Sequence, residues 1–195
     1  MKLTIDDIAD LRAYERERDD FRRHIIDLKK QRRIPVGPFV TFVFENRDTI
    51  RFQIQEMARA EKILTDEAIQ TELEIYNPLI PESGSLAATM FIELTSKDEL
   101  KEWLPKLVGI ESAVELRVGG RVVRARVDPE HEKQLTRDTI TASVHYVHFD
   151  LGVEGIERFA TERAAVAIAH PNYAFVTELD DVSKKSLLID LRGGS

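Results

Sequence analysis

A pair of adjacent glycines, Gly119-Gly120, constrains the fold of this chain more than any other feature. Adjacent glycines supply the positive φ angles that a two-residue hairpin turn requires. The flanking residues, 114–118 and 121–127, alternate apolar and charged side chains, as strands with one buried face do. This turn places Glu115 opposite Arg124, which is a favourable cross-strand pair. The hairpin therefore predicts an antiparallel sheet.

Other segments predict further strands and helices. Apolar and β-branched residues indicate strands at 39–44, 86–94, 140–149 and 173–179. Apolar spacing of three and four residues indicates helices at 6–33, 66–76, 97–107, 156–168 and 181–191, with a short helical turn at 128–130. Ser96 and Glu99 are predicted to cap the 97–107 helix reciprocally. Both faces of the 140–149 strand are apolar, which indicates a central position. Because strands and helices do not alternate regularly, we expect an α+β fold whose mainly antiparallel sheet of about five strands is covered by helices.

The chain is expected to form a single domain over residues 1–195, with a long N-terminal helix at 6–33 and an α+β core at 39–195. The helix carries an apolar stripe at Ile8, Leu11, Tyr14, Phe21, Ile25 and Leu28. At 1.5 Å per residue it would be roughly 40 Å long, more than a domain of this size readily covers. We therefore expect the helix to contribute to a homodimer or to bind a partner.

Residues 45–61 follow the first strand and are compatible with two structures. As a helix, Ile50, Ile54 and Met57 share one face. As the return strand of a hairpin, residues 50–54 alternate apolar and polar side chains. The helix is the preferred interpretation, because good helix formers concentrate toward its end.

The start of this helix is the predicted ligand site. Strand ends and the helix starts that follow them gather outside a sheet edge, where loops leave a crevice. Free N–H groups at a helix start favour an anion, and an arginine adds a bidentate donor. The side chains predicted to line the site are Glu45, Asn46, Arg47, Gln53 and Glu56. Gln53 and Glu56 lie one turn into the helix and along one edge of it. Asp48 or Thr49 is the expected cap of this helix start. In the alternative to a ligand site, Arg47 pairs with Glu45 or Asp48, and Gln53 caps a neighbouring loop.

Three residues are candidates for catalysis: Glu56, His145 and His148. Either histidine suits a general base or a metal ligand. In a strand, however, the two point to opposite faces and cannot bind one ion without a bulge. The alternative is that both histidines are ordinary hydrogen-bonded residues of the core or surface. Glu45 and Glu61 are further carboxylates that suit a cation.

Motifs for common cofactors are missing. No E-x-x-H pair falls on a predicted helix, so a ferritin-like di-iron site is not expected. The sequence has no P-loop, no G-x-G-x-x-G after a strand, no H-E-x-x-H and no G-x-S-x-G. We therefore expect no metal and no cofactor, and nucleotide-binding and hydrolase functions have no support.

Composition excludes several further classes of protein. The chain has no cysteine, which excludes disulfides, thiol catalysis and cysteine-ligated iron–sulfur clusters. The net charge of −7 argues against general affinity for nucleic acid. No run of about 18 apolar residues indicates a membrane-spanning helix. The N-terminus lacks the apolar segment of a secretory signal, so a cytoplasmic location is expected.

Three segments carry a resemblance: V-F-E-N-R-D-T-I-R-F-Q-I-Q-E-M at 43–57, I-A-D-L-R-A-Y-E-R-E-R at 8–18 and Y-N-P-L-I-P at 76–81. Together they resemble an uncharacterised bacterial family of about this length, catalogued only as a domain of unknown function. Members of that family are often encoded beside rubrerythrin-like proteins and iron–sulfur oxidoreductases. The resemblance implies a role in peroxide or oxygen defence, with a protein of one of these two kinds as partner. It assigns no catalytic residue.

Two functions follow from these observations. In the first, the chain is an accessory protein that supports a redox system by binding and has no cofactor of its own. In the second, it is a small enzyme, or a metal- or anion-binding protein, whose Glu56 and a histidine lie beside Asn46, Arg47 and Gln53. A cleft in which these side chains converge would favour the enzyme, and their separation would favour the accessory protein.

Overall fold

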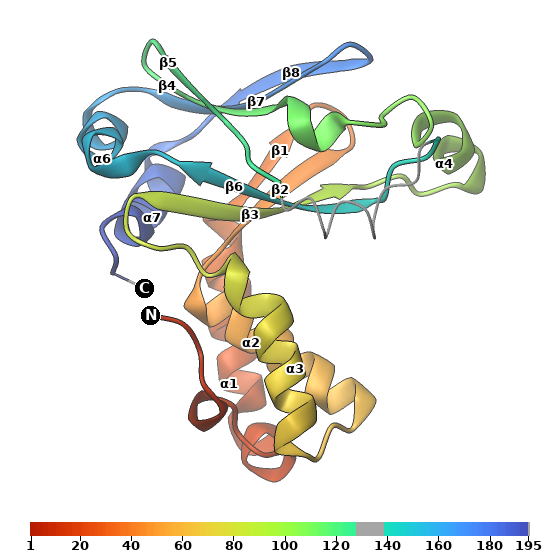
Figure 1. Ribbon diagram of the computed structural model, residues 1–195, viewed down its shortest axis with the longest axis vertical. Coiled ribbons are helices and arrows are strands. Elements are labelled where there is room, and N and C mark those ends of the chain that lie inside the picture. Colours follow the sequence, from red (N-terminus) through yellow and green to blue (C-terminus); the bar gives the residue numbers. More distant parts are fainter. Residues whose placement is uncertain (128–138, 195) are drawn as a thin grey trace.

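The computed structural model describes residues 1–127 and 139–194 and shows an α+β fold with two antiparallel sheets of four strands each. The first sheet has the order β1-β2-β3-β6 and the second the order β5-β4-β7-β8 (Figure 1). The strands are β1 (Arg33–Val36), β2 (Val40–Glu45), β3 (Ser85–Ile92), β4 (Val114–Val118), β5 (Arg121–Arg124), β6 (Val144–Asp150), β7 (Ala164–His170) and β8 (Tyr173–Glu178).

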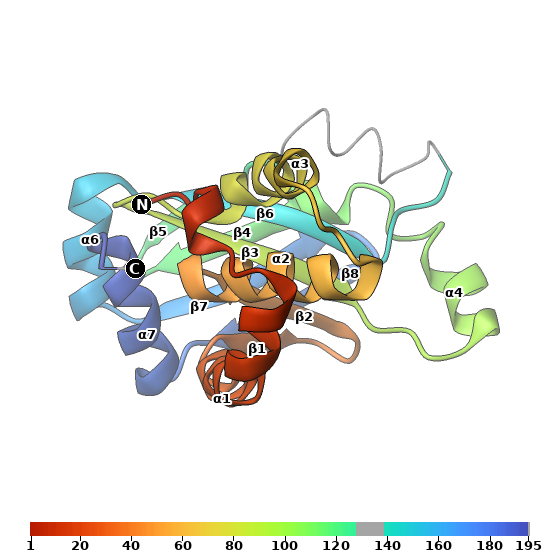
Figure 2. The same ribbon diagram turned by 90° about the horizontal axis from the view of Figure 1, so that it is seen from below.

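Helices flank the two sheets and also form a separate limb. The helices are α1 (Leu11–Lys30), α2 (Arg47–Glu61), α3 (Asp66–Tyr76), α4 (Lys97–Trp103), α6 (Gly152–Thr161) and α7 (Asp181–Leu191). Short 3-10 turns are η1 (Ile5–Asp7), η2 (Asn77–Leu79) and η3 (Ile110–Ala113). The limb consists of α1, α2 and α3 and projects from the first sheet, whereas α6 and α7 lie near the chain termini (Figures 1 and 2).

The α+β class and the antiparallel pairing are confirmed, but the expected single sheet of about five strands is wrong. The chain forms two sheets because their apolar faces bury one another in a shared core, as in a β-sandwich. Phe42 and Phe149 come from the first sheet, and Leu116 and Val166 from the second; all four are fully buried. Alternation along the strands marks a buried face but does not say which strands share a sheet.

The two sheets are linked at both pairs of edges. Beyond β5, Arg126 forms an antiparallel backbone bridge with His148 on β6. At the opposite edge, Tyr173 Oη on β8 donates to the Val36 carbonyl at 2.8 Å. Gly37 follows with φ +76°, and a Cβ there would lie only 2.5 Å from Tyr173 Oη. Glycine is therefore required at this turn both by its backbone angle and by the close approach of the tyrosine.

The predicted helix at 6–33 is shorter than expected at both ends. After η1 the chain is extended at Ile8, and Asp10 caps α1 by accepting from the N–H groups of Arg12 and Ala13 at 2.9 Å each. The helix contains 20 residues, which corresponds to roughly 30 Å. The helix ends at Lys30, and Arg33 begins β1, a strand that the sequence did not predict. This strand pairs with β2.

A second correction concerns 156–168, where one helix was predicted. Helix α6 ends at Thr161, and Ala164 begins β7, which pairs with both β4 and β8. Alanine favours helices in isolation, but pairing with two neighbouring strands overrides that preference. Val166 and Ile168 of β7 lie in the shared core.

The strand predicted at 140–149 was expected to be central, and this is wrong. Within its sheet β6 pairs with only β3, so it forms the sheet edge.

Most other local predictions are confirmed. Glu115 lies opposite Arg124 in the hairpin. Residues 47–61 form a helix and not a return strand. Ser96 and Glu99 form the reciprocal cap of α4. The predicted helical turn at 128–130 lies outside the described residues.

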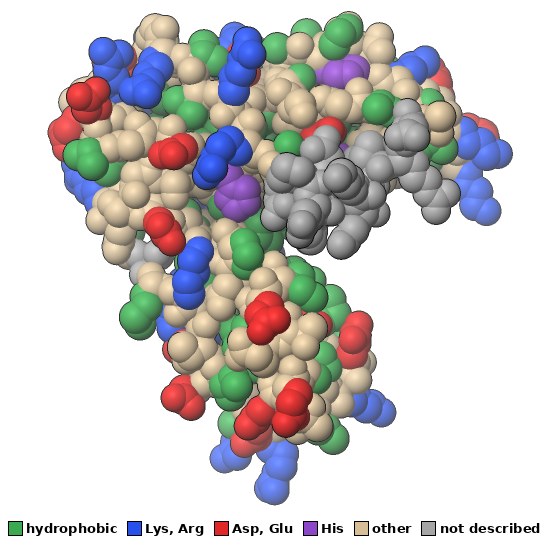
Figure 3. Space-filling view, viewed as in Figure 1, with side chains coloured by type: hydrophobic (Ala, Val, Ile, Leu, Met, Phe, Trp, Pro, Cys, Tyr) green, Lys and Arg blue, Asp and Glu red, His purple; other side chains and the backbone are tan. Residues whose placement is uncertain are grey.

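The limb is held together largely by contacts between α1 and α2. Arg51 on α2 pairs with Glu17, and the ring of Phe52 meets Phe21 edge-on at 5.7 Å between centroids. Figure 3 shows acidic side chains gathered over the lower part of the limb.

No helix in the described ranges is long and apolar enough to cross a membrane. Because α2 begins directly after β2, the limb meets the outer face of the first sheet where the predicted ligand site lies.

Candidate functional site

The junction between β2 and α2 is built by a reciprocal cap. The Asn46 side chain accepts from the Thr49 N–H at 3.0 Å, and Thr49 Oγ1 accepts from the Asn46 N–H at 2.9 Å. The N-cap is therefore Asn46, and the predicted cap at Asp48 or Thr49 is wrong by two or three residues. The Asn46 side-chain oxygen is engaged in starting the helix.

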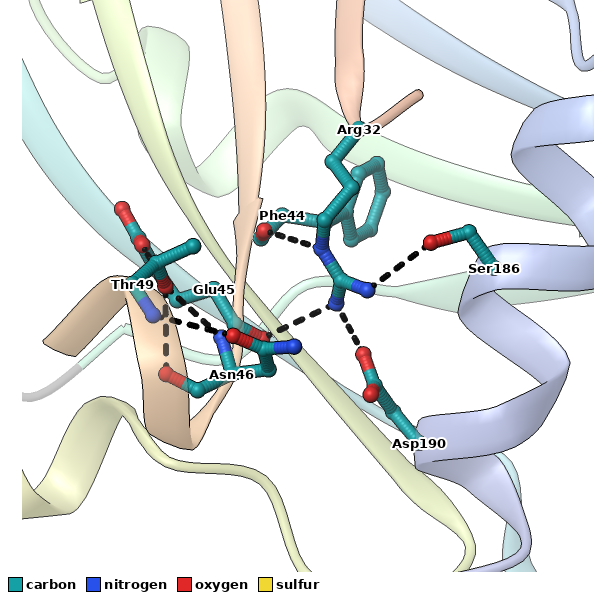
Figure 4. Close-up of polar contacts among 7 residues, drawn as sticks. All are labelled: Arg32, Phe44, Glu45, Asn46, Thr49, Ser186 and Asp190. Atoms are coloured by element: carbon teal, nitrogen blue, oxygen red, sulfur yellow. Dashed lines mark hydrogen bonds and ion pairs between the residues drawn. The ribbon is translucent and has the colours of Figure 1, made fainter. Parts of the chain in front are cut away.

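Glu45, the last residue of β2, places a carboxylate on the side of the first sheet that faces the limb. Thr49 Oγ1 donates to its Oε2 at 2.5 Å, and Thr89 Oγ1 on β3 donates to its Oε1 at 2.6 Å. Only 7% of Glu45 is exposed. The carboxylate thus joins β2, β3 and α2 through neutral hydroxyl groups. Figure 4 shows the contact with Thr49.

A cleft of about 250 Å³ opens beside this carboxylate, between the first sheet and the limb. We call it the Glu45 cleft. Its lining side chains are Lys29, Glu45, Ile50, Gln53, Tyr76, Leu79, Thr89, Phe91, Val144 and Tyr146. Burial raises the pKa of the Tyr146 hydroxyl, and the nearby Tyr76 and Glu45 raise it further. The cleft therefore combines a carboxylate with a largely apolar and aromatic wall.

Arg32 occupies the other side of the junction and was not among the predicted site residues. Its guanidinium donates to the Phe44 carbonyl at 2.9 Å and to the Glu45 carbonyl at 3.3 Å. It also donates to Ser186 Oγ at 3.0 Å and forms an ion pair with Asp190, both on α7 (Figure 4). Both partners of the ion pair are almost fully buried. In the sequence Arg32 is indistinguishable from the rest of a basic run, so only the fold reveals this role.

A second cleft, of about 210 Å³, lies next to this network. We call it the Arg47 cleft; it is lined by Leu28, Arg32, Asn46, Arg47, Asp48, Ser186, Ile189, Asp190 and Gly194. Arg47 pairs with Asp7 of η1, and its Nε has no hydrogen-bond partner among the described residues. The predicted alternative, in which Arg47 pairs with Glu45 or Asp48, is wrong about the partner, because Arg47 pairs with Asp7, which is distant in sequence.

Glu56 points away from both clefts and toward α1. Tyr14 Oη donates to its Oε1 at 2.8 Å, and Arg18 donates to both carboxylate oxygens at 2.8 and 2.9 Å. The Arg18 hydrogen bonds are the main cause that lowers the pKa of the Glu56 carboxyl. Glu56 therefore joins the two long helices of the limb and does not accompany Gln53 as predicted.

Replacing Glu56 by glutamine is expected to destabilise the chain at neutral pH and to have little effect in acid. A carboxyl whose pKa is lowered by folding stabilises the fold above its ordinary pKa of 4.5, and that contribution is lost as the pH falls through the lowered value. Urea denaturation of wild type and Glu56→Gln across this pH range measures the difference. Glu157→Gln, on the exposed side of α6, is the control. A loss of stability that is equal at all pH values would contradict the role assigned to Glu56.

The two candidate histidines lie on opposite faces of β6, as predicted. His145 is buried, with Nε2 at 2.9 Å from both Thr141 Oγ1 and the Ala142 carbonyl oxygen. Its Nδ1 lies 3.8 Å from Oε2 of the buried Glu111. His148 lies on the other face, and its backbone forms the bridge to Arg126.

The predicted site residues therefore divide into several environments. Glu45 and Gln53 line one cleft, Asn46 and Arg47 line the other, and Glu56 lies between α1 and α2. Glu61 ends α2 at the far end of the limb. Within residues 1–127 and 139–194, no three histidine, aspartate or glutamate side chains are grouped so that they could hold a metal ion.

Comparisons with known proteins place the whole chain in one family. A family model described as "Protein of unknown function (DUF3501)" matches residues 2–191. A crystal structure of a novel protein of unknown function from Burkholderia pseudomallei K96243 is 36% identical to this chain. The similarity covers 98% of this chain and 100% of that one, with a TM-score of 0.89. No curated protein matches.

Proposed function

Because the chain belongs to the DUF3501 family, whose description assigns no function, we propose a function from the site itself: a cytoplasmic accessory protein that binds a small ligand in the Glu45 cleft. The observation that carries this proposal is the buried Glu45 carboxylate at the wall of a cleft of about 250 Å³. Sites for drug-sized ligands usually measure roughly 300–1,000 Å³. The ligand is accordingly a small metabolite.

The separation of the candidate catalytic groups supports binding over catalysis. Glu56 is engaged by Tyr14 and Arg18, His145 lies in the core, and His148 lies on the opposite face of β6. A general base must come within hydrogen-bond reach of the same substrate as the other catalytic groups. The three side chains do not share one cleft, so the enzyme is the less favoured candidate.

A macromolecular partner also belongs to the proposal. The resemblance implies a rubrerythrin-like or iron–sulfur partner in oxidative-stress defence. Because this chain has no cysteine, a cysteine-ligated iron–sulfur cluster would lie on the partner.

We also propose a homodimer that forms through α1. Ile26 of this helix is 43% exposed, whereas Tyr14 and Ile25 are buried within the chain. Nucleic acid is not proposed as a partner. Sedimentation of the chain alone and mixed with a rubrerythrin-like protein tests both assemblies; a monomer in each case would reject them.

Ligand binding is tested by a thermal-shift screen of small metabolites, using a variant that fills the cleft. Gln53 is an exposed residue of α2 at the cleft, so Gln53→Trp should block it without disturbing the core. Compounds that raise the melting temperature of wild type should have no effect on Gln53→Trp. The reason is that the indole ring occupies the volume that the ligand needs.

Ala60→Trp is the matched control, because Ala60 is also exposed on α2 but does not line the cleft. It should respond to the same compounds as wild type. Compounds that stabilise Gln53→Trp as strongly as wild type would show that binding occurs elsewhere. A screen without any stabilising compound would reject the proposed function.

A further inference from the structure

We propose that the Glu45 cleft recognises the ammonium group of a small organic amine, an inference that rests on the proposed binding function. Its starting point is the charge of Glu45. The ion pairs among the described residues do not include Glu45. Arg32 is close, but it donates to the backbone carbonyl of Glu45 and pairs with Asp190. A buried carboxylate without a cation is costly, and a bound ammonium group would offset that cost.

The carboxylate also has hydrogen-bonding capacity to spare. An ionised carboxylate offers about four acceptor positions. Within the described residues, one hydroxyl from Thr49 and one from Thr89 donate to it. These two hydroxyl groups come from α2 and β3, so they hold the carboxylate in a fixed orientation. An ammonium group brings three donors and full positive charge to the remaining positions.

The wall of the cleft suits the rest of such a ligand. Ile50 and Leu79 offer apolar surface to an alkyl chain. Tyr76, Phe91 and Tyr146 add aromatic rings, whose faces attract cations. A primary amine with a short alkyl chain thus matches both the charge and the apolar character of the cleft.

Lys29, at the end of α1, is the basic side chain that lines the cleft. Its ammonium group would oppose a ligand cation placed close to it and attract a ligand carboxylate. The amine can therefore come from two sources: a simple alkylamine, or an amino acid whose carboxylate reaches Lys29. Both share the ammonium group that Glu45 would receive.

The test is isothermal titration calorimetry of the full chain at neutral pH with four probes of similar length. The probes are n-pentylamine, 1-pentanol, pentanoate and norvaline. The amine should bind at least about tenfold more tightly than the alcohol or the acid, because only the amine offers a cation to the buried carboxylate. Norvaline binding more tightly than pentylamine, with that advantage lost in Lys29→Met, would identify amino acids as the source. The reverse order would identify simple amines.

Two pairs of variants test the role of charge. Glu45→Gln should weaken pentylamine binding at least about tenfold. Glu93→Gln, which alters an exposed carboxylate just after β3, should not. Gln53→Lys and Gln53→Glu change charge at the mouth without touching the buried hydroxyl contacts. The lysine variant should weaken amine binding and the glutamate variant should strengthen it, even if Glu45→Gln fails to fold.

Failure of this inference is distinguishable from failure of the proposed function. If 1-pentanol binds as tightly as pentylamine and both are lost in Gln53→Trp, the cleft binds ligands but not through their charge, and only the amine inference is overturned. If amine binding is unchanged by Gln53→Lys and Gln53→Glu, it is likewise overturned. If no probe binds and no screened compound depends on the cleft, both proposals are rejected.

Discussion

Replacing Arg32 by alanine should lower the free energy of unfolding by about 3–5 kcal/mol, because it leaves the buried Asp190 without its partner. Arg32 is 1% exposed and Asp190 is 2% exposed, so the ion pair is shielded from solvent in the intact chain. The carbonyl groups of Phe44 and Glu45 would lose their guanidinium donor as well. Urea denaturation at neutral pH measures this loss.

Arg33 provides a matched control at the next position. It pairs with Glu93, but both side chains are about half exposed, so Arg33→Ala should cost less than about 1 kcal/mol. The double variant Arg32→Met/Asp190→Leu should recover much of the lost stability, since it removes the buried charges together. If Arg32→Ala were no more costly than Arg33→Ala, the network would not anchor α7 to the base of the limb.

Phe149→Ala should also cost about 3–5 kcal/mol, because truncation of a buried phenylalanine leaves a cavity that the surroundings fill only partly. Phe149 is fully buried between the two sheets, with its ring 6.2 Å from that of Phe44. Phe175 on β8 is the control: it is 42% exposed, and its ring contacts that of Tyr173 at 4.7 Å between centroids. Phe175→Ala should cost about 1 kcal/mol, the value of a partly exposed aromatic pair.

Chemical denaturation of both phenylalanine variants tests the sandwich directly. Equal losses in the two variants would mean that the space between the sheets is not the main core. A larger loss in Phe149→Ala, with near-native circular dichroism, is the expected result.

Local signals in the sequence predicted local structure well. The Gly119-Gly120 turn and the Ser96–Glu99 cap depend on residues close in sequence, and both are confirmed. Strand β7 was missed because its alanines favour a helix until β4 and β8 pair with it. The division into two sheets was missed for a related reason: which apolar faces meet is decided by contacts distant in sequence.

The candidate site shows the same limit. Glu45 and Gln53 were predicted because polar residues that follow an apolar strand are visible in the sequence. Thr89 and Lys29 complete the cleft from β3 and α1, and nothing local connects them with Glu45. Glu56 was assigned to the site from helical spacing, but its carboxylate faces α1. Helical spacing says which residues are neighbours along the helix and not what lies opposite them.

A crystal structure of the chain with n-pentylamine, or with the strongest stabiliser from the screen, shows whether the Glu45 cleft is a ligand site. We expect ligand density between Glu45 and Gln53, with a ligand nitrogen within hydrogen-bond distance of the Glu45 carboxylate. Density in the Arg47 cleft instead, or an empty Glu45 cleft at saturating ligand, would contradict it.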